Sequence, residues 1–348
     1  MTSQYSDSTL YINLAAVRDN YLLLKSKAKG AETAAVVKAN GYGLGVKEIA
    51  GTLKKAGCKK FFVATLDEAL ELKDSCFRRN DGVEILAFNG IRKGQEKIFC
   101  ENKIIPVLNT LEEAKLWGKN GNNLPACLHV DTGMNRLGLG LKEAENFESK
   151  INIKYLMSHL ACADQPDHPK NAEQLKAFRN IEKFFPNAKK SLANSAGIVL
   201  GKGYHFDLVR PGIALYAGAN TVVTLKAKII QIRKIDRPTT VGYGATANVA
   251  KGTIIATLPV GYADGYLRVL GNTGHCFIGG VKVPVIGRVS MDLLTLDVTK
   301  VKNPHVGMEV ELIGKHLSVD EIAGQAETIS YEILTRLGSR FDRIYLEK

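Results

Sequence analysis

The chain has 348 residues, 45% of them hydrophobic and 24% charged, which is ordinary for a globular protein and enough for a large core and two domains. No apolar run is long enough to span a membrane, and the polar N-terminus lacks the basic and apolar stretches of a secretory signal. The net charge is +12, but the lysines occur in small groups with no nucleic-acid-binding motif near them, so we expect a solvated basic surface and neither a nucleic-acid nor a membrane partner.

Cysteine usage points to a reducing compartment. The six cysteines are scattered, without a CxxC pair and without the spacing of a zinc site. They are Cys58, Cys76, Cys100, Cys127, Cys162 and Cys276. This pattern predicts reduced thiols, a cytoplasmic protein and no metal site.

Short apolar runs alternate with helical patterns through the first two-thirds of the chain. The predicted strands are Ala34–Ala39, Phe61–Thr65, Val83–Phe88, Ile104–Leu108, Ala126–Asp131, Ile153–His159, Ser191–Asn194 and Phe206–Arg210. The predicted helices include Val46–Ala56, Leu66–Asp74, Leu111–Lys119 and Asn171–Phe185, with Thr65, Thr110 and Asn171 as N-caps. Eight strands that mostly alternate with helices favour an α/β fold of the (β/α)₈ TIM-barrel type over an open doubly wound sheet.

The pattern changes after about Gly218, where Gly and Pro separate short strands. The predicted strands are Val222–Arg233, Thr253–Leu258, His275–Ile278, Val281–Ile286, Leu294–Val298 and Glu309–Leu312, with helices at Ser318–Gln325 and Ser330–Leu337. We therefore predict a barrel domain over residues 10–220 and a mostly β C-terminal domain over residues 221–348. The early strand Thr9–Leu14, within residues 1–14, could pair with the second domain before the chain enters the barrel.

Lys38 is the most informative single residue. The apolar run Ala34–Val37 leads directly into this lysine, and a Gly-rich turn follows. A lysine at the end of a buried strand has a lowered pKa, which frees its amine as a base or as a nucleophile toward an aldehyde cofactor. The alternative is a strand-end lysine that reaches water along its stem.

Other polar residues also follow predicted strands. They are the Asp131–Arg136 segment, His159, Asn194, Ser195, Arg210 and Gly212. In a TIM barrel the chemistry lies at the C-terminal ends of the strands, so these groups and Lys38 would converge on one mouth.

The motifs together resemble those of the alanine racemase family, and they cover nearly the whole chain in the family's order. They are Val36–Gly45, Val130–Gly138, Met157–His159, Ala193–Ala196, Val209–Ile213, Gly242–Ala245, Gly261–Gly265, Gly287–Asp292 and Ser330–Glu332. The resemblance implies a barrel followed by a β domain, pyridoxal 5'-phosphate (PLP) as cofactor, and interconversion of L-alanine and D-alanine, which supplies D-alanine for peptidoglycan. It also implies a cytoplasmic homodimer with shared active sites.

By resemblance, Lys38 carries the cofactor and also acts as one general base. The second base is then Tyr243, supplied by the partner subunit from its β domain, with His159 and Arg210 in the network that favours its phenolate. Arg210 would face the pyridine nitrogen, where a group that only donates hydrogen bonds makes the cofactor a weaker electron sink. The alternative for Arg210 is an ion pair with a nearby carboxylate such as Asp207.

The remaining site residues follow from the same resemblance. The cofactor is expected to contact Tyr42, Asn194, Ser195, Gly212, Ile213 and Tyr331. The substrate is expected to contact Arg136, Met291, Asp292 and Tyr262, with Arg288 and Asp164 near the entry. Ser195 could instead be only a helix N-cap, and Met291 only a core residue.

One position departs from the family pattern. Many members have a lysine two residues before the Asp of the Asp-Thr-Gly-Met motif, and its carbamate can hold the arginine; here the residue is His129. Histidine is neutral or cationic, so we hypothesise that water, a bound anion or another side chain supports Arg136. The rival functions are a racemase of broader amino-acid specificity, a barrel-type PLP decarboxylase and a non-catalytic PLP carrier.

Overall fold

The computed structural model describes residues 6–77, 82–148 and 150–347. Their contacts divide the chain into two compact units. The barrel unit consists of Arg18–Gly41 and Gly45–Leu215, and the β-rich unit of Met1–Val17, Tyr42–Leu44 and Tyr216–Lys348. Helix α1 (Leu14–Lys27) begins in the β-rich unit and continues into the barrel unit.

The barrel unit is built on parallel strands that close on themselves. The strands are β2 (Glu32–Thr33), β3 (Ala35–Val36), β4 (Lys60–Val63), β5 (Glu84–Ala87), β6 (Ile105–Leu108), β7 (Ala126–His129), β8 (Ile153–Met157), β9 (Lys189–Ser191) and β10 (Leu208–Val209). Strands β3 to β9 form one sheet in sequence order, and β10 pairs with β2.

Two further sets of backbone hydrogen bonds complete the ring. Asp207 and Arg210 donate their N–H groups to Lys190 and Ala193 at 3.0 and 2.9 Å, which joins β10 to β9. Ala34, between β2 and β3, donates to Val209 at 3.0 Å. Strands β2 and β3 thus act as one bent strand, and the predicted eight-stranded barrel is confirmed.

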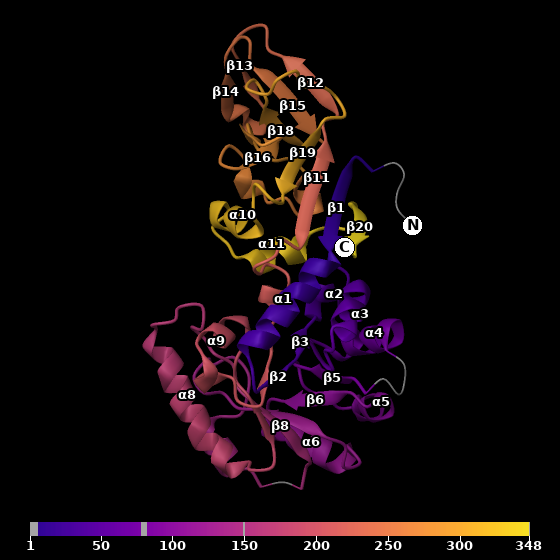
Figure 1. The fold of residues 1–348 in the computed structure, drawn as a ribbon, viewed down its shortest axis with the longest axis vertical. Helices are drawn as coiled ribbons and strands as arrows, with labels where there is room; N and C mark the ends of the chain where they lie inside the picture. Colours follow the sequence, from indigo (N-terminus) through magenta and orange to yellow (C-terminus); the bar gives the residue numbers. More distant parts are fainter. Residues whose placement is uncertain (1–5, 78–81, 149, 348) are drawn as a thin grey trace. The chain divides into compact units, whose positions relative to one another are not determined.

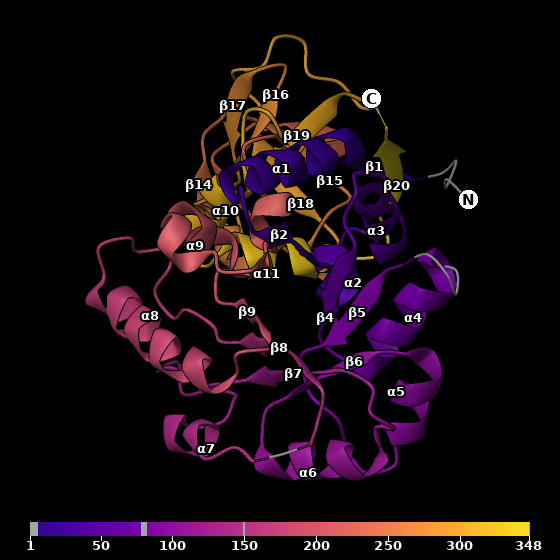
Figure 2. The ribbon, with the colours of Figure 1, turned by 60° about the horizontal axis from the view of Figure 1, so that its bottom comes forward.

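Helices alternate with these strands and cover the outside of the sheet; Figure 2 shows α4, α5 and α6 outside the strands that they connect. They are α2 (Lys38–Tyr42), α3 (Val46–Lys55), α4 (Leu66–Cys76), α5 (Glu96–Asn102), α6 (Leu111–Asn120), α7 (Leu141–Glu145), α8 (Pro169–Ile181) and α9 (Ser195–Val199). The 3₁₀ turns are η1 (Glu182–Phe184), η2 (Lys202–Tyr204) and η3 (Ile213–Leu215).

Two of the three predicted N-caps are confirmed. The Thr65 and Thr110 hydroxyls accept the N–H groups of the residues three positions on, at 3.2 and 3.1 Å. The prediction for Asn171 is wrong, because His168 caps α8 and Pro169 occupies its first turn. Asn171 lies inside the helix, buried, and its amide donates to the Cys162 and Gln165 carbonyls.

The strands of the β-rich unit form three sheets, and Figure 1 labels most of these strands. The six-stranded sheet has the order β17-β16-β19-β11-β1-β20, and β12, β15 and β18 form a second sheet while β13 pairs with β14. The strands are β1 (Ser8–Asn13), β11 (Val223–Lys228), β12 (Gln231–Lys234), β13 (Thr239–Val241), β14 (Ala247–Val249), β15 (Ile254–Leu258), β16 (His275–Ile278), β17 (Val281–Pro284), β18 (Leu294–Asp297), β19 (Glu309–Ile313) and β20 (Asp342–Leu346).

Short helices complete this unit: η4 (Tyr243–Ala245), η5 (Tyr262–Asp264), η6 (Arg268–Leu270), α10 (Val319–Gln325) and α11 (Ser330–Arg336). The early strand β1 lies between β11, to which it is antiparallel, and β20, to which it is parallel. No helix among the described residues is both long and apolar enough to cross a membrane.

The single strand predicted at Val222–Arg233 is wrong, because the chain changes sheets there. Ile229 donates its N–H to the Met308 carbonyl, beside β19, whereas Ile230 donates to Thr257 of β15. The apolar pattern continues where the hydrogen-bonded neighbour changes from β19 to β15, so periodicity alone predicts one strand in place of β11 and β12.

A polar cluster lies where several barrel strands begin. Glu32, Lys60 and Glu84 start β2, β4 and β5, and the Lys60 ammonium lies 2.6 Å from Glu32 and 3.9 Å from Glu84. Lys154 and the Tyr155 hydroxyl of β8 also bind the Glu84 carboxylate. Burial by itself would raise the pKa of Glu84, but these hydrogen bonds and the Lys60 charge outweigh it and lower the pKa.

We predict that Glu84→Gln destabilises the protein by ~1–3 kcal/mol at pH 7, because it removes a charged acceptor from Lys154 and Tyr155. Since the folded-state pKa of Glu84 is lowered, its contribution is present above the ordinary glutamate pKa and is lost as the pH falls through the folded-state value. Urea unfolding should therefore show the two proteins converging at acid pH. The exposed Glu71→Gln serves as control; an equal loss for both variants would contradict the prediction.

Candidate active site

Lys38 stands at the start of a strained turn. Only Val37 separates it from β3, and the next three residues, Ala39, Asn40 and Gly41, all have positive φ, at 53°, 53° and 63°. Non-glycine residues in this left-handed region cost about 1 kcal/mol or more each, and such strain gathers at functional sites. The backbone is thus forced away from a regular βα connection directly after the lysine.

Glu68, in the first turn of α4, holds this turn in place. Its carboxylate accepts the Ala39 N–H at 2.7 Å and the Ala64 N–H at 2.6 Å, so it joins the ends of β3 and β4. The Asn40 side chain accepts the Val46 N–H at 2.8 Å and fixes the far side of the turn. The position of Lys38 is therefore set by side chains that the sequence analysis did not single out.

Lys38 is exposed as a whole residue, and its ammonium lies 5.8 Å from the centre of the Phe88 ring. Crowding by the surrounding protein lowers its pKa, the Arg136 charge lowers it further, and Glu68 opposes the shift in part. A larger fraction of the amine is therefore unprotonated at neutral pH than for a free lysine, as a nucleophile or base requires.

Arg210 lies at the end of β10 and is 2% exposed. Its guanidinium donates to the Ser191 hydroxyl, to the Ser158 carbonyl at 2.6 Å and to the Leu192 carbonyl at 3.4 Å. The predicted alternative, an ion pair with Asp207, is wrong, since the Asp207 carboxylate instead accepts the Lys190 N–H. Burial lowers the pKa of Arg210 only to about 10, so it remains charged at neutral pH.

Two histidines beside Arg210 are held neutral. Burial lowers the pKa of His159 to about 3, helped by the charges of Arg210 and Arg136. Burial lowers the pKa of His129 to about 4, helped by the same two arginines. These mutual effects bring Lys38, Arg136, His159 and Arg210 together, as the sequence predicted for strand ends, and they add His129 to the group.

Ser195 is a second anchor at this end of the barrel. Asn194 caps α9 by accepting the Gly197 N–H at 2.8 Å, so the alternative of Ser195 as the N-cap is wrong. The Ser195 hydroxyl instead accepts the N–H groups of Gly212 and Ala214, at 2.8 and 3.3 Å, on either side of Ile213. A hydroxyl and a backbone turn held together in this way suit an anionic group.

Within the β-rich unit, Tyr42 belongs to a cluster of aromatic rings. It stacks on Tyr216 at 4.5 Å between ring centres and lies 6.0 Å from Tyr331. The segment is fixed by Arg343, which donates to the Gly43 carbonyl at 2.7 Å, and by the Tyr345 hydroxyl, which donates to Leu44 at 3.0 Å. A Cβ at Gly43, where φ is 81°, would lie 2.4 Å from the Leu334 carbonyl oxygen, so only glycine fits.

A second set of predicted residues is gathered by the loops of the β-rich unit. Tyr243 opens η4 with its side chain 73% exposed, and the adjacent Gly244 lies against the Arg288 guanidinium. Tyr262 donates its N–H to Ser290, and Ala263 donates to Met291, both at 3.0 Å. Arg288 and Met291 are three residues apart, so one continuous set of loops carries Tyr243, Tyr262 and Met291.

This loop set exposes large apolar side chains. Met291 is 55% exposed and Tyr262 43%, so the alternative of Met291 as a core residue is wrong. Asp292 is held by Arg340 at 2.7 Å, and Arg340 also binds the buried Asp264 at 2.6 Å. Rigid loops that present exposed aromatic and methionine side chains are typical of surfaces that meet another molecule.

The comparisons with known proteins agree over the whole chain. Residues 12–220 match the family model of the alanine racemase N-terminal domain, and residues 222–345 match that of the C-terminal domain. The chain belongs to the alanine racemase family. The alanine racemase of Rickettsia akari (strain Hartford) is 44% identical, covering 97% of this chain and 99% of the relative; that of Rhodospirillum rubrum is 45% identical, covering 97% and 95%.

Solved alanine racemase structures have the same fold. The enzyme from Bartonella henselae, with covalently bound pyridoxal phosphate, superposes with a TM-score of 0.92 at 40% identity, covering 97% of this chain and 99% of that one. The biosynthetic alanine racemase from Pseudomonas aeruginosa gives a TM-score of 0.90 at 32% identity, covering 98% and 99%. The predicted family and fold class are therefore confirmed.

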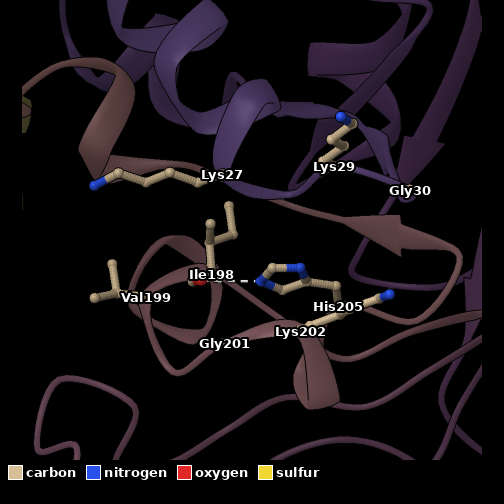
Figure 3. A pocket seen from close by; sticks show the side chains of 8 residues that line it. All are labelled: Lys27, Lys29, Gly30, Ile198, Val199, Gly201, Lys202 and His205. Carbon is tan, nitrogen blue, oxygen red and sulfur yellow. Dashed lines mark hydrogen bonds between the residues drawn. The ribbon is translucent and has the colours of Figure 1, made fainter.

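A hollow of about 650 Å³ elsewhere in the barrel unit contains none of the predicted site residues. Its lining comes from α1, α9, η2 and the loops beside them, which precede β2 and β10: Lys27, Lys29, Gly30, Ile198, Val199, Gly201, Lys202 and His205. Figure 3 shows the three lysine amines pointing away from one another, while the His205 ring bonds the Ile198 carbonyl. These charges do not converge, so the hollow itself offers no site for an anionic group.

We predict that Ser195→Ala destabilises the cofactor-free protein by ~1–2 kcal/mol, because the Gly212 and Ala214 N–H groups lose their acceptor. If the same hydroxyl and turn bind the phosphate of PLP, the added stability given by PLP should also fall. Urea unfolding with and without PLP measures both effects.

Ser195→Thr keeps the hydroxyl and is the matched control, while the exposed Ser26→Ala reports any general effect of serine removal. If Ser195→Ala unfolds at the same urea concentration as Ser26→Ala, the Ser195 hydroxyl does not organise this turn.

Proposed function

We propose that this protein interconverts L-alanine and D-alanine with PLP. The observation that carries the proposal is the pairing at one barrel mouth of an amine with a lowered pKa, Lys38, and a buried guanidinium, Arg210. The residues present fit PLP: Lys38 can hold its aldehyde carbon, Arg210 can only donate to its ring nitrogen, and the Ser195 turn suits its phosphate.

When bound, PLP supplies an electron sink that makes the substrate Cα–H acidic enough to be removed. Around it, we propose contacts from His159, Asn194, Ser195, Arg210, Gly212 and Ile213 of the barrel unit and from Tyr42 and Tyr331 of the β-rich unit. A donor-only arginine at the ring nitrogen limits how far negative charge is withdrawn, which favours return of the proton over side reactions.

Two bases are needed because the proton must leave one face of Cα and arrive on the other. We propose that the Lys38 amine serves one face and the Tyr243 phenolate of the partner subunit the other. The lowered pKa of Lys38 supports its role, since it favours the unprotonated amine, which is the form that accepts a proton. For Tyr243 the support is its place at the tip of η4, 73% exposed and so available to a second subunit.

We propose a homodimer with shared active sites, in which the loop set of Tyr243, Tyr262 and Met291 enters the partner's barrel mouth. Its exposed apolar side chains would otherwise face water, which supports an interface there. We propose that the substrate carboxylate binds to Arg136 and to Met291 and Asp292 of the partner subunit. We also propose that the entry is narrowed by Tyr262, Arg288 and Asp164.

The remaining parts of the proposal rest on the family. We propose a barrel domain over residues 10–220 and a β-rich domain over 221–348, a cytoplasmic location, D-alanine supply for peptidoglycan, and no nucleic-acid partner. The alternative is a PLP racemase of broader specificity. A screen of amino acids by optical rotation would decide: interconversion of another amino acid without alanine would refute the alanine assignment.

We predict that Lys38→Ala and Tyr243→Phe each abolish most racemisation, and that mixing the two inactive proteins restores activity. If Tyr243 acts in the partner's site, each mixed dimer holds one site with both bases intact. Random reassortment makes about half of the dimers mixed, and one of the two sites in each mixed dimer works. About a quarter of wild-type activity should therefore return. Chiral chromatography of alanine measures the rate.

Mixing Lys38→Ala with a second batch of itself is the control. Absence of recovery, with subunit exchange shown by native mass spectrometry, would contradict the shared site. Separately, Tyr243→Phe should slow hydrogen exchange at Cα from one alanine enantiomer more than from the other; equal slowing would contradict the two-base assignment.

A further inference from the structure

We propose that Asn109 and His129 form a positioning pair: Asn109 fixes His129 as the tautomer protonated on Nδ1, and the free Nε2 lone pair accepts a hydrogen bond from the Arg136 guanidinium. The inference rests on the proposed role of Arg136 at the substrate carboxylate. Asn109, directly after β6, belongs to no sequence motif of the site.

The orientation of the Asn109 amide is fixed by its surroundings. Its NH₂ group donates to the Phe88 carbonyl at 3.0 Å and to the Val107 carbonyl at 2.9 Å, which uses both hydrogens. The amide oxygen therefore faces His129 Nδ1, 2.9 Å away. Because an amide oxygen only accepts, Nδ1 must carry the hydrogen, and Nε2 of the neutral ring must carry the lone pair.

The pair is also rigid. Asn109 is 4% exposed, and its own N–H donates to the Glu113 carboxylate at 2.7 Å. The same carboxylate accepts from Arg92 and lies against Gly90, where a Cβ would be 2.3 Å away. Asn109 cannot turn its amide over without breaking hydrogen bonds to β5 and β6, so the tautomer of His129 is set by the barrel itself.

His129 stays neutral in its surroundings. The charged and titratable groups around it are Asp131 and Arg136 after β7, His159 after β8, Arg210 after β10 and, through Asn109, Glu113 of α6. Burial and the two arginines outweigh Asp131 and lower its pKa to about 4. Its ring thus remains an acceptor at any pH well above 4, which covers neutral conditions.

Arg136 is the donor best suited to this acceptor. Arg210 is committed elsewhere, since its guanidinium donates to oxygens at the ends of β8 and β9 and its remaining N–H groups are proposed for the ring nitrogen of the cofactor. Across residues 6–77, 82–148 and 150–347, neither Arg136 nor His129 Nε2 has a hydrogen bond of its own. A side chain, the third of the supports considered above, can therefore orient Arg136 without a bound anion.

The decisive measurement is the tautomer of His129. We expect ¹⁵N spectra of histidine-labelled protein at pH 7 to show Nδ1 protonated and Nε2 bare, with the signal assigned by its loss in His129→Gln. A protonated Nε2 at pH 7 would overturn the proposal. The tautomer is measured without activity. If the protein failed to racemise alanine, the proposed function would be refuted, but the spectra would still show which nitrogen of His129 carries the hydrogen.

Kinetics tests the action of the pair on Arg136. Asn109→Asp still accepts from Nδ1 but stabilises the doubly protonated ring, so Nε2 becomes a donor beside Arg136. We expect the KM for alanine to rise about ten-fold with a smaller change in kcat, and the defect to shrink as the pH rises and the ring loses its proton.

His129→Gln, which keeps an acceptor oxygen but does not titrate, should hold KM near the wild-type value at every pH. His129→Leu should raise it at every pH. A wild-type KM for Asn109→Asp across pH 6–9, or equal KM values for the Gln and Leu variants, would overturn the proposal; if Asn109→Asp does not fold, the Gln and Leu pair decides.

Discussion

The buried guanidinium of Arg210 is the charge on which the rim of the barrel depends. It is satisfied by oxygens at the ends of β8 and β9, while its own backbone closes β10 onto Ala193. A buried charge without such partners would cost several kcal/mol, so the closing strand, the two neighbouring strand ends and the charge form one arrangement. Loss of the ring closure would leave the charge unsatisfied, and loss of the charge would leave Ser158 and Ser191 without their donor.

That charge also sets the protonation of its neighbours. His129 and His159 are neutral because they are buried beside Arg210 and Arg136. Burial and the Arg136 charge also lower the pKa of the Lys38 amine. The mouth therefore keeps positive charge on arginine, which does not titrate near neutral pH, while its two histidines stay neutral. Such a site attracts phosphate and carboxylate groups and can still move protons.

The sequence predicted the parts of the fold that depend on burial and local chemistry. Strand runs, the caps at Thr65 and Thr110, and the Lys38 turn all follow from residue type and spacing. Periodicity reports which residues are buried, not which backbone groups they pair with, so the change of sheet at Ile229 and Ile230 could not be read from it. The cap at His168 was missed because Pro169 was not read as the first turn of α8.

Glu68 and Glu113, which support the site, were also missed because a sequence pattern does not show which distant backbone groups a side chain binds. A repeated pattern at the two helix starts was nevertheless present. Thr65–Glu68 and Thr110–Glu113 repeat the same pattern of Thr, Leu and two acidic residues at the start of a helix. In both places the second acidic side chain reaches beyond its own helix cap, to Ala39 and Ala64 in one case and to Asn109 and Arg92 in the other.

Each of these glutamates therefore fixes a strand end from which the site is built: Glu68 the turn after Lys38, and Glu113 the residue that orients His129. A capping pattern predicts only the local hydrogen bond to the helix start. The free carboxylate oxygen also holds a neighbouring strand because the barrel is parallel. In such a barrel the end of one strand lies beside the start of the helix that follows the next strand. The same short pattern thus caps a helix through its threonine and fixes a strand end beside the active site through its glutamate.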